Sequence, residues 1–366
     1  MTSIKKICFF ISDISKIGGT ERVCTKVANR LFIEGFQVQV LSMYNAKPFF
    51  KLLPGIKVAS VLAKRVNRFL IPYTVWKIRK KFEVIKPDIV IDVDSALFLY
   101  TRIASIKMQL KIVIWEHFNF KFANQSLARR LSRKMALKYG DAIVTLTEKD
   151  REVWRKYAPN KHIVSIPNPS PLTPARINEH ERKQIVLSVG RLTAQKGFDI
   201  LLNVWAKVNQ HVSSGWMLYI IGSGESKIRL ESQIQKARLQ ASVKLIPATG
   251  EIENYYKQAA IYCMTSRYEG FPMALLEAQS FGLPLLSFDC ETGPSEIITS
   301  GYNGLLVKNG DVDAMASELT MLIERAEIRT NFGANAKKNA EQYQIDHIIK
   351  LWFKLFSLLA ENWRLK

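Results

Sequence analysis

The sequence of 366 residues contains little cysteine and no long apolar run. Its four cysteines, Cys8, Cys24, Cys263 and Cys290, lie in apolar stretches without C-x-x-C spacing. This pattern argues against a disulfide framework and favours reduced core residues of a cytosolic protein. No run of 18 or more apolar residues occurs, so we expect no transmembrane helix. The amino terminus enters an apolar strand without a cleavage pattern, so we expect no signal peptide.

Acidic residues are scarce in the first half of the chain. Residues 1–170 contain 31 of the 53 Lys and Arg residues but only 12 of the 32 Asp and Glu residues. This half therefore carries a formal net charge of +19 out of a total of +21. Such asymmetry indicates an anionic surface partner, which the charge alone leaves open between nucleic acid and anionic lipid.

The length and the 48% content of hydrophobic residues allow two domains, each with its own core. A proline-rich stretch at residues 167–174 predicts a linker, and it coincides with the change in charge. Strand and helix patterns alternate on both sides of it, which predicts an α/β protein with two doubly wound parallel sheets facing one cleft. We expect domains at residues 1–168 and 184–345, followed by a helix at residues 346–366.

The stretch from Ser266 to Glu277 joins a predicted buried strand to a predicted helix at residues 273–281. Pro272 suits the first helical position, where a missing N–H costs nothing. The next amides, of Met273 and Ala274, have no acceptor within the helix. Together with the helix dipole they favour an anion such as a phosphate.

Two carboxylates bracket this anion site, Glu269 in the loop and Glu277 after the first helical turn. A carboxylate beside a phosphate is unfavourable unless it accepts hydrogen bonds from other donors, and sugar hydroxyls are such donors. A nucleotide-sugar fits this arrangement, with its diphosphate on the amides and its hydroxyls on the acids. Alternatively, the early acids only complement the helix dipole.

A second candidate site follows the predicted strand at residues 184–189. Arg191 and Lys196 flank a loop before a helix, and they are either two surface cations or two groups that converge on a diphosphate. Gly222 begins a Gly-Ser-Gly turn after the next strand, a weaker signal of a phosphate loop.

The first half offers two weaker signals. Gly18 and Gly19 join a strand to a helix whose first turn contains Glu21, so backbone N–H groups can approach a ligand there. His117 follows a strand predicted at residues 111–115, at the edge where open α/β sheets bind ligands. A lone histidine is nevertheless more often structural than catalytic.

Two basic segments concentrate the charge of the first half. Residues 64–82 contain seven cations, several aromatic residues and no acid, and Pro72 is expected to break the segment into two helical pieces. Residues 124–139 predict a second basic amphipathic helix, with Arg129, Arg133 and three other cations. These helices are either solvated faces or membrane-surface helices, and the one-sided charge favours the membrane.

The sequence resembles a known family at these same motifs. Glu269 and Glu277, separated by seven residues and followed by Gly-Leu-Pro at residues 282–284, resemble the signature of the family 4 retaining glycosyltransferases, which have the GT-B fold. Residues 288–298 and 303–307 are also similar to that family. The resemblance covers nearly the whole chain, and it is strongest in the second half.

The resemblance implies roles for the candidate residues. Glu269 and His117 would hold and orient the transferred sugar, and Glu277 would hold the ribose. Glu21 would lie near the sugar or the acceptor. The groups that would bind the donor and stabilise the charge of the leaving phosphate share the turns described above: Gly18, Gly19, Arg191, Lys196, Gly222, Glu269, Gly270, Phe271, Met273, Ala274 and Glu277. The helix at residues 346–366 would pack back onto the first domain.

The expected chemistry needs neither a metal nor another cofactor. No Asp-x-Asp motif has a placement that indicates a metal site; Asp92-Val-Asp94 has the letters, but it ends a buried strand in the first half. The resemblance implies retention of anomeric configuration, with the departing phosphate oxygen taking the acceptor proton. It also implies a hexose or N-acetylhexosamine donor, UDP-linked with GDP as the alternative, and a polyprenyl-diphosphate-linked glycan acceptor. A peripheral enzyme on the cytosolic face of the inner membrane, active in bacterial surface polysaccharide synthesis, fits these expectations.

Three other interpretations remain at this point. The net charge alone is compatible with a nucleic-acid-binding protein, although no recognition motif occurs, so we expect no nucleic-acid partner. A GT-B fold also serves epimerases and phosphorylases of related sugars. An inactive scaffold is the third, and the presence of Arg191, Lys196, Glu269 and Glu277 argues against it.

Overall fold

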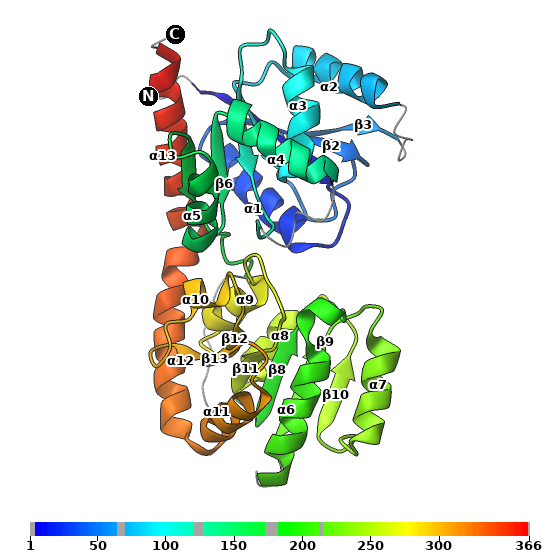
Figure 1. Cartoon of the computed structure of the whole chain (residues 1–366), viewed down its shortest axis with the longest axis vertical. Helices are drawn as coiled ribbons and strands as arrows, with labels where there is room; N and C mark the ends of the chain where they lie inside the picture. The colour runs from blue at the N-terminus through cyan, green and yellow to red at the C-terminus, as the bar shows by residue number, and fades with distance from the viewer. Residues whose placement is uncertain (1–3, 64–69, 121–126, 173–181, 212–214, 365–366) are drawn as a thin grey trace. The chain divides into compact units, whose positions relative to one another are not determined.

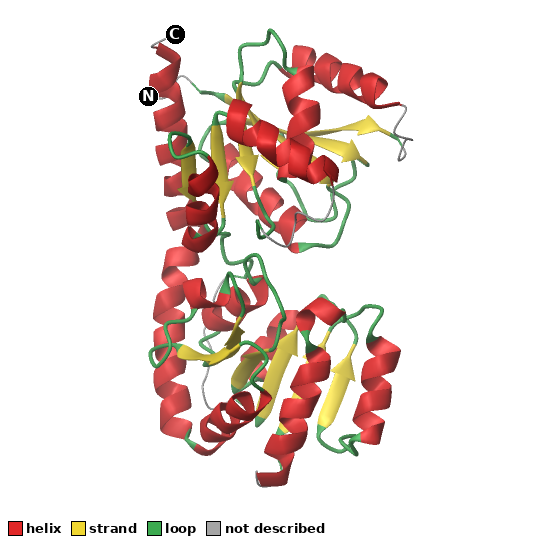
Figure 2. Cartoon of the chain, in the orientation of Figure 1, coloured by secondary structure: helices red, strands yellow, loops and turns green. Residues whose placement is uncertain are grey.

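The computed structural model describes residues 4–63, 70–120, 127–172, 182–211 and 215–364. The contacts within the chain divide it into two units. The first contains Met1–Pro169 together with Gln344–Lys366, and the second contains Ser170–Tyr343. Each unit has its own parallel sheet flanked by helices (Figures 1 and 2).

The first unit contains a seven-stranded parallel sheet in the order β3-β2-β1-β4-β5-β6-β7. The strands are β1 Lys6–Asp13, β2 Gln37–Tyr44, β3 Lys57–Leu62, β4 Ile89–Val93, β5 Lys111–Trp115, β6 Ala142–Thr145 and β7 His162–Ser165. All five residues of β4 are buried, as expected for a central strand covered on both faces. In the register of the sheet, Phe9 of β1 lies between Val40 and Ile91.

Helices join the successive strands of this sheet, except that a loop without a helix joins β2 to β3. They are α1 Gly19–Ile33, α2 Ile71–Ile85, α3 Phe98–Ala104, α4 Leu127–Tyr139 and α5 Glu148–Tyr157, with a 3-10 turn η2 at Ser95–Leu97. The last helix, α13 Ile345–Arg364, also packs on this unit. Its apolar stripe places Trp352 against Trp115, with ring centroids 5.0 Å apart, and Phe353 and Phe356 against Phe36.

The second unit contains a six-stranded parallel sheet in the order β10-β9-β8-β11-β12-β13. Its strands are β8 Ile185–Val189, β9 Met217–Ile221, β10 Val243–Ile246, β11 Ile261–Met264, β12 Leu285–Asp289 and β13 Gly304–Lys308. Its helices are α6 Phe198–His211, α7 Lys227–Lys236, α8 Ile252–Gln258, α9 Met273–Ser280, α10 Pro294–Ile297, α11 Val312–Glu324 and α12 Ala326–Ala340, with 3-10 turns η5 at Ala194–Lys196 and η6 at Glu341–Tyr343.

Both sheets have the doubly wound topology that the alternating pattern predicts. In each, the strand order reverses once, at β1/β4 in the first unit and at β8/β11 in the second. Open α/β sheets bind ligands outside the carboxyl ends of the strands at such a reversal. The fold therefore directs attention to the loops that follow these four strands and their neighbours.

Several local expectations need correction. Pro72 lies in the first turn of α2 and does not split the described part of its segment, because the first turn needs no N–H from it. Residues 64–69, and the first three residues of the helix expected at 124–139, lie outside the described residues. Pro272 is the residue before α9 rather than its first residue. None of the described helices combines the length and the hydropathy needed to cross a bilayer.

Candidate functional site

The loops that follow β8 and β11 lie side by side at the strand-order reversal of the second unit. The backbone N–H of Arg267 donates to the carbonyl oxygen of Gln195 over 2.8 Å, and the side-chain amide of Gln195 donates to the carbonyl oxygen of Tyr268 over 3.0 Å. The hydroxyl of Thr265 donates to the carbonyl oxygen of Gly197. Gly197 has a φ of +64°, and a Cβ there would clash with the Thr265 carbonyl oxygen, so the approach of the two loops requires glycine.

This pairing brings two of the expected site residues together. The Nζ atom of Lys196 lies 2.7 Å from Oε1 of Glu269, in an ion pair whose acidic side chain is only 6% exposed. The hydroxyl of Thr292 donates to the carbonyl oxygen of Glu269 and fixes the loop from the other side. The sequence predicts that Lys196 binds phosphate and that Glu269 binds sugar hydroxyls, and in the structure these two side chains are neighbours.

The other expected residues of this unit lie around that pair. Arg191 is exposed at the start of the loop and forms no ion pair with any described residue. Gly222 allows the turn after β9 to approach the loop after β8, because a Cβ there would clash with the carbonyl oxygen of Gly190. Gly270 lies against the turn at Gly293, whose φ is +99°.

Helix α9 places the second acid of the expected site. Met273 and Ala274 form its first turn, and Glu277 follows on the same helix. The carboxylate of Glu277 is buried and accepts a hydrogen bond of 2.7 Å from the hydroxyl of Tyr256 on α8. Tyr256 is not predicted from the sequence, because no motif distinguishes it from the adjacent Tyr255 on the same short helix.

Phe271 belongs to the packing of this loop. Its side chain is buried and contacts the ring of Tyr343, with centroids 5.9 Å apart. At this position the backbone is therefore the part that can contact a donor.

The expected residues of the first unit lie at the carboxyl ends of β1 and β5. Gly18 is the residue before α1, and the carboxylate of Glu21 lies against its Cα. His117 is buried beside Trp115, with ring centroids 4.6 Å apart, and its Nε2 atom forms no hydrogen bond with a described residue. Burial lowers the pKa of His117 to about 3, so the imidazole is neutral near pH 7 and can donate or accept a hydrogen bond.

A buried ion pair supports the loop that contains His117. Nε and Nη2 of Arg133 lie 3.1 and 3.0 Å from Oε2 of Glu116, and both side chains are almost fully buried. The other carboxylate oxygen of Glu116 accepts from the N–H of Phe118. The Nη1 atom of Arg133 donates to the carbonyl oxygen of Phe120 over 2.6 Å. This corrects the expectation that Arg133 contributes to a solvated or membrane-facing cationic surface.

A second acid fixes the same loop. Oδ1 of Asp150, at the start of α5, accepts from the N–H of Phe120 over 3.1 Å. Burial is the main cause that raises the pKa of Asp150 to about 7, and the nearby Glu116 raises it further. The loop from Glu116 to Phe120 is therefore anchored by two different helices.

Comparisons with known proteins agree with this geometry. Residues 17–172 match the family described as Glycosyltransferase Family 4, and residues 171–339 match the family described as Glycosyl transferases group 1. A Haemophilus influenzae protein named "Uncharacterized glycosyltransferase" is 35% identical over 357 residues, which cover 95% of this chain and 99% of that protein. The chain is a glycosyltransferase.

Other relatives and solved structures extend the comparison. The amylovoran biosynthesis glycosyltransferase AmsD of Erwinia amylovora is 29% identical, with 95% of this chain and 98% of that protein covered. The structure of S. aureus TarM in complex with UDP and other ligands has a TM-score of 0.80 at 16% identity, covering 96% of this chain and 100% of that one. The glycosyltransferase thus has the GT-B fold that the motifs of the second half indicate.

The Asp92-Val-Asp94 motif of the glycosyltransferase forms its contacts within the first unit. Asp92 is buried and accepts from the hydroxyl of Thr101 over 2.6 Å. Asp94 pairs with Arg129 over 2.6 Å, and burial raises the pKa of Asp94 to about 6. Across the described residues, no group of three or more His, Cys, Asp or Glu side chains has the arrangement of a metal site.

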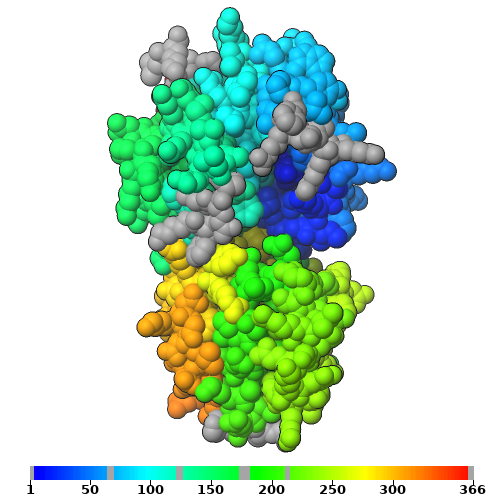
Figure 3. Space-filling model, turned by 45° about the vertical axis from the view of Figure 1, so that its right-hand side comes forward, coloured from blue at the N-terminus to red at the C-terminus, as the bar shows by residue number. Residues whose placement is uncertain are grey.

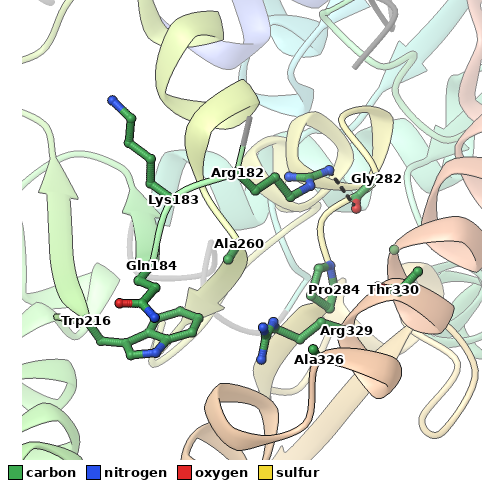
Figure 4. A pocket seen from close by; sticks show the side chains of 11 residues that line it. Arg182, Lys183, Gln184, Trp216, Ala260, Gly282, Pro284, Ala326, Arg329 and Thr330 are labelled. Atoms are coloured by element: carbon green, nitrogen blue, oxygen red, sulfur yellow. Dashed lines mark hydrogen bonds between the residues drawn. The ribbon is translucent and has the colours of Figure 1, made fainter. Parts of the chain in front are cut away.

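A hollow of about 200 Å³ lies at the opposite edge of the second sheet, where β8, β11 and β12 begin (Figure 4). Its two arginines bind backbone carbonyl oxygens. Arg182 donates to Ala259, Phe281 and Gly282, and Arg329 donates to the end of α11 and stacks on Trp216. The guanidinium groups thus cap helices and connections, so this hollow is not part of the candidate site.

Proposed function

We propose that this glycosyltransferase moves a hexose or N-acetylhexosamine, with retention, from a UDP-linked donor to a lipid-linked oligosaccharide in bacterial surface polysaccharide synthesis. The observation that carries the proposal is the contact of Lys196 with Glu269 at the strand-order reversal of the second sheet. A diphosphate needs a cation, a sugar needs a carboxylate as hydrogen-bond acceptor, and this pair supplies both within 2.7 Å.

The leaving diphosphate gains negative charge as the glycosidic bond breaks. Lys196, Arg191 and the amides at the start of α9 would stabilise that charge where it develops. Glu269 would accept hydrogen bonds from the sugar, and Glu277 would accept them from the ribose. This division of roles requires no enzymic nucleophile, because the departing phosphate oxygen takes the proton of the attacking hydroxyl.

The first unit is assigned to the sugar and the acceptor. The neutral imidazole of His117, whose Nε2 atom has no hydrogen-bond partner among the described residues, can exchange hydrogen bonds with sugar hydroxyls. Gly18 and Gly19 would offer backbone amides to the donor, and Glu21 would accept a hydrogen bond from the acceptor.

Two comparisons support the choice of donor and acceptor. A Campylobacter jejuni relative, 25% identical over 96% of this chain, is named for N-acetylgalactosaminyl transfer to a glycan on undecaprenyl diphosphate. Solved structures of the same fold, among them Anabaena HepE with a TM-score of 0.80, are in complex with UDP and glucose. A UDP-linked sugar and a polyprenyl-linked acceptor are therefore the substrates to test first.

A membrane face is proposed for the first unit, at the cytosolic side of the inner membrane. Helix α3 contacts both α2 and α4, and all three reach the surface (Figures 1 and 3). On α2, Tyr73 and Trp76 are exposed and stacked 6.0 Å apart, and Lys77 lies over the Tyr73 ring. On α4, Leu127 and Leu131 are exposed. Apolar side chains among cations are typical of a surface that binds anionic lipid.

Liposome binding tests this face. Binding that increases with the anionic lipid content and decreases with salt supports the proposal. Equal, salt-insensitive binding to neutral and anionic vesicles would reject it. A filter-binding assay with single-stranded and duplex nucleic acid runs in parallel, because a basic surface that binds nucleic acid more tightly than lipid would favour the other partner.

Donor turnover tests the site. A panel of nucleotide-sugars is first screened for thermal stabilisation, since a ligand bound by the native state raises the melting temperature. Lys196→Ala and Glu277→Ala are then assayed for sugar transfer with the best donor, and Lys207→Ala serves as the control because Lys207 forms an exposed ion pair with Asp313. If Lys196→Ala and Glu277→Ala transfer sugar at rates within a few-fold of the wild-type rate, the assignments are rejected.

Product analysis tests the reaction class and the absence of a metal requirement. The anomeric configuration of the product distinguishes retention from inversion, and the identity of the product distinguishes transfer from epimerisation or phosphorolysis. Activity that survives a chelator supports leaving-group stabilisation by Arg191, Lys196 and the α9 amides without a metal ion, whereas a loss of activity that a divalent ion restores would reject it.

A further inference from the structure

Arg267 lies inside the stretch that contains Glu269, yet the proposed function gives it no role. Its guanidinium binds the carboxylate of Asp199 through two hydrogen bonds, of 2.9 and 2.7 Å. Its Nη1 atom also donates to the carbonyl oxygen of Ala194 over 2.6 Å. Ala194 begins the turn that ends at Lys196, and Asp199 lies in the first turn of α6 directly after it. One side chain therefore binds the loop after β8 on both sides of Lys196.

The backbone of Arg267 is held by the same loop and by Asn309, which follows β13. Its N–H donates to the carbonyl oxygen of Gln195, and its carbonyl oxygen accepts from the side chain of Asn309 over 3.1 Å. The position two residues after Arg267 is Glu269, and the position two residues after Ala194 is Lys196. The hydrogen bonds of Arg267 thus set the register of the two loops, and this register brings the Lys196 ammonium to the Glu269 carboxylate.

We propose that Arg267 is a positioning residue, which through Asp199 and the Ala194 carbonyl holds Lys196 and Glu269 together for joint recognition of the diphosphate and the sugar of the donor. The inference rests on the proposed function, since it assigns these two groups to a nucleotide-sugar. Its geometry suits arginine in particular, because a planar fork binds a carboxylate through two atoms and still reaches a carbonyl, whereas lysine offers a point charge.

The chain provides a matched control. Arg229 also forms an ion pair with Asp199, at 3.2 Å, but its side chain is 62% exposed and no hydrogen bond to either loop accompanies that ion pair. The ion pair with Arg267 lowers the pKa of Asp199, to which Arg229 also contributes, so both arginines face an ionised partner at neutral pH. Arg229→Ala therefore removes a cation from Asp199 without removing the link between the loops.

The experiment compares Arg267→Ala, Arg267→Lys and Arg229→Ala with the wild type in the full chain. In the absence of donor, we expect hydrogen exchange of the amide at position 267 to become about tenfold faster in Arg267→Ala and to stay unchanged in Arg229→Ala. With the donor identified in the thermal screen, Arg267→Ala should raise the donor KM or lower kcat/KM by about tenfold to a hundredfold. Arg267→Lys should recover only part of either effect, and the melting temperatures establish that each variant is folded.

The outcomes separate the two claims. Unchanged hydrogen exchange in Arg267→Ala overturns the positioning role, whatever the activity. Faster hydrogen exchange in Arg267→Ala together with wild-type donor kinetics also overturns the positioning role. An equal loss of kcat/KM in Arg229→Ala overturns it too, because the effect would then belong to the charge balance at Asp199. If the wild type transfers sugar from no donor, the proposed function fails on that result, and the exchange data alone then decide whether Arg267 holds the loops.

Discussion

The buried ion pair of the first unit gives a prediction whose magnitude follows from the structure. The side chains of Arg133 and Glu116 are 2% and 0% exposed. Replacing Arg133 by methionine keeps most of the apolar volume but leaves the Glu116 carboxylate buried without its cation. Breaking a buried pair in this way costs about 3–5 kcal/mol, compared with about 1 kcal/mol or less for an exposed pair.

The assay is thermal unfolding of the variant and of two controls. At about 2–4 °C per kcal/mol for a unit of this size, Arg133→Met should lower the melting temperature by about 10 °C. Lys80→Ala, which removes an exposed ion pair with Glu83 in the same unit, should shift it by about 4 °C or less. The double variant Arg133→Met with Glu116→Leu should recover part of the loss, because no charge then remains buried.

The recovery is expected to be incomplete for a specific reason. Glu116 also accepts from the N–H of Phe118, and Arg133 donates to the carbonyl oxygen of Phe120. The double variant leaves both backbone groups without these partners, at about 1–3 kcal/mol each. A single variant that melts like Lys80→Ala would refute the reasoning, since it would show that the pair behaves as if it were solvated.

Three further predictions follow from the same contacts. Tyr256→Phe removes the hydroxyl that donates to Glu277 and should leave the protein folded. Initial rates should show a donor KM about fivefold to tenfold above that of the wild type. Gly197→Ala should destabilise the second unit by about 2–4 kcal/mol, measured by urea unfolding, because the new Cβ clashes with the backbone and the φ is left-handed. Gly310→Ala is the control: it has only a φ of +85° to accommodate and should cost about 1 kcal/mol. Folding raises the pKa of Asp150 from an ordinary value near 3.8 to about 7, so the folded state holds this proton more tightly than the unfolded state. The contribution of Asp150 to stability is therefore lost as the pH rises from about 4 through 7. Asp150→Asn keeps an acceptor for Phe120, and the stability of the wild type relative to this variant should fall between pH 5 and pH 8; a constant difference would show that Asp150 does not titrate in that range.

The fold was predictable because its signals are local. Continuous apolar runs such as residues 112–115 predict strands buried on both faces, and helices between them predict parallel crossovers. The pairing of Lys196 with Glu269 was less accessible to sequence analysis. Each residue type suggested a ligand group, but 73 positions separate them, and only the sheet order places β11 beside β8.

Arg133 and Tyr256 show why the rest of the site was missed. A basic amphipathic helix predicts exposed cations, and nothing local to α4 distinguishes Arg133 from its exposed neighbours Arg130 and Lys134. Its burial depends on Glu116, which is 17 positions earlier at the end of a strand. Tyr256 likewise has the pattern of a core residue, and its polar role depends on one carboxylate of the neighbouring helix.

These cases share a physical cause. A loop that presents ligand groups buries too little apolar surface to fix its own conformation, so directional bonds from a rigid neighbour must do so. In the first unit Arg133 and Asp150 bind the backbone of Phe120, and in the second Arg267 binds the carbonyl oxygen of Ala194. In each case an arginine pairs with an acid and donates to a main-chain carbonyl oxygen. Substitutions of the two arginines should therefore have different effects. Substituting Arg133, which is fully buried, should mainly reduce stability, and substituting Arg267, which is partly exposed, should mainly reduce the use of the donor.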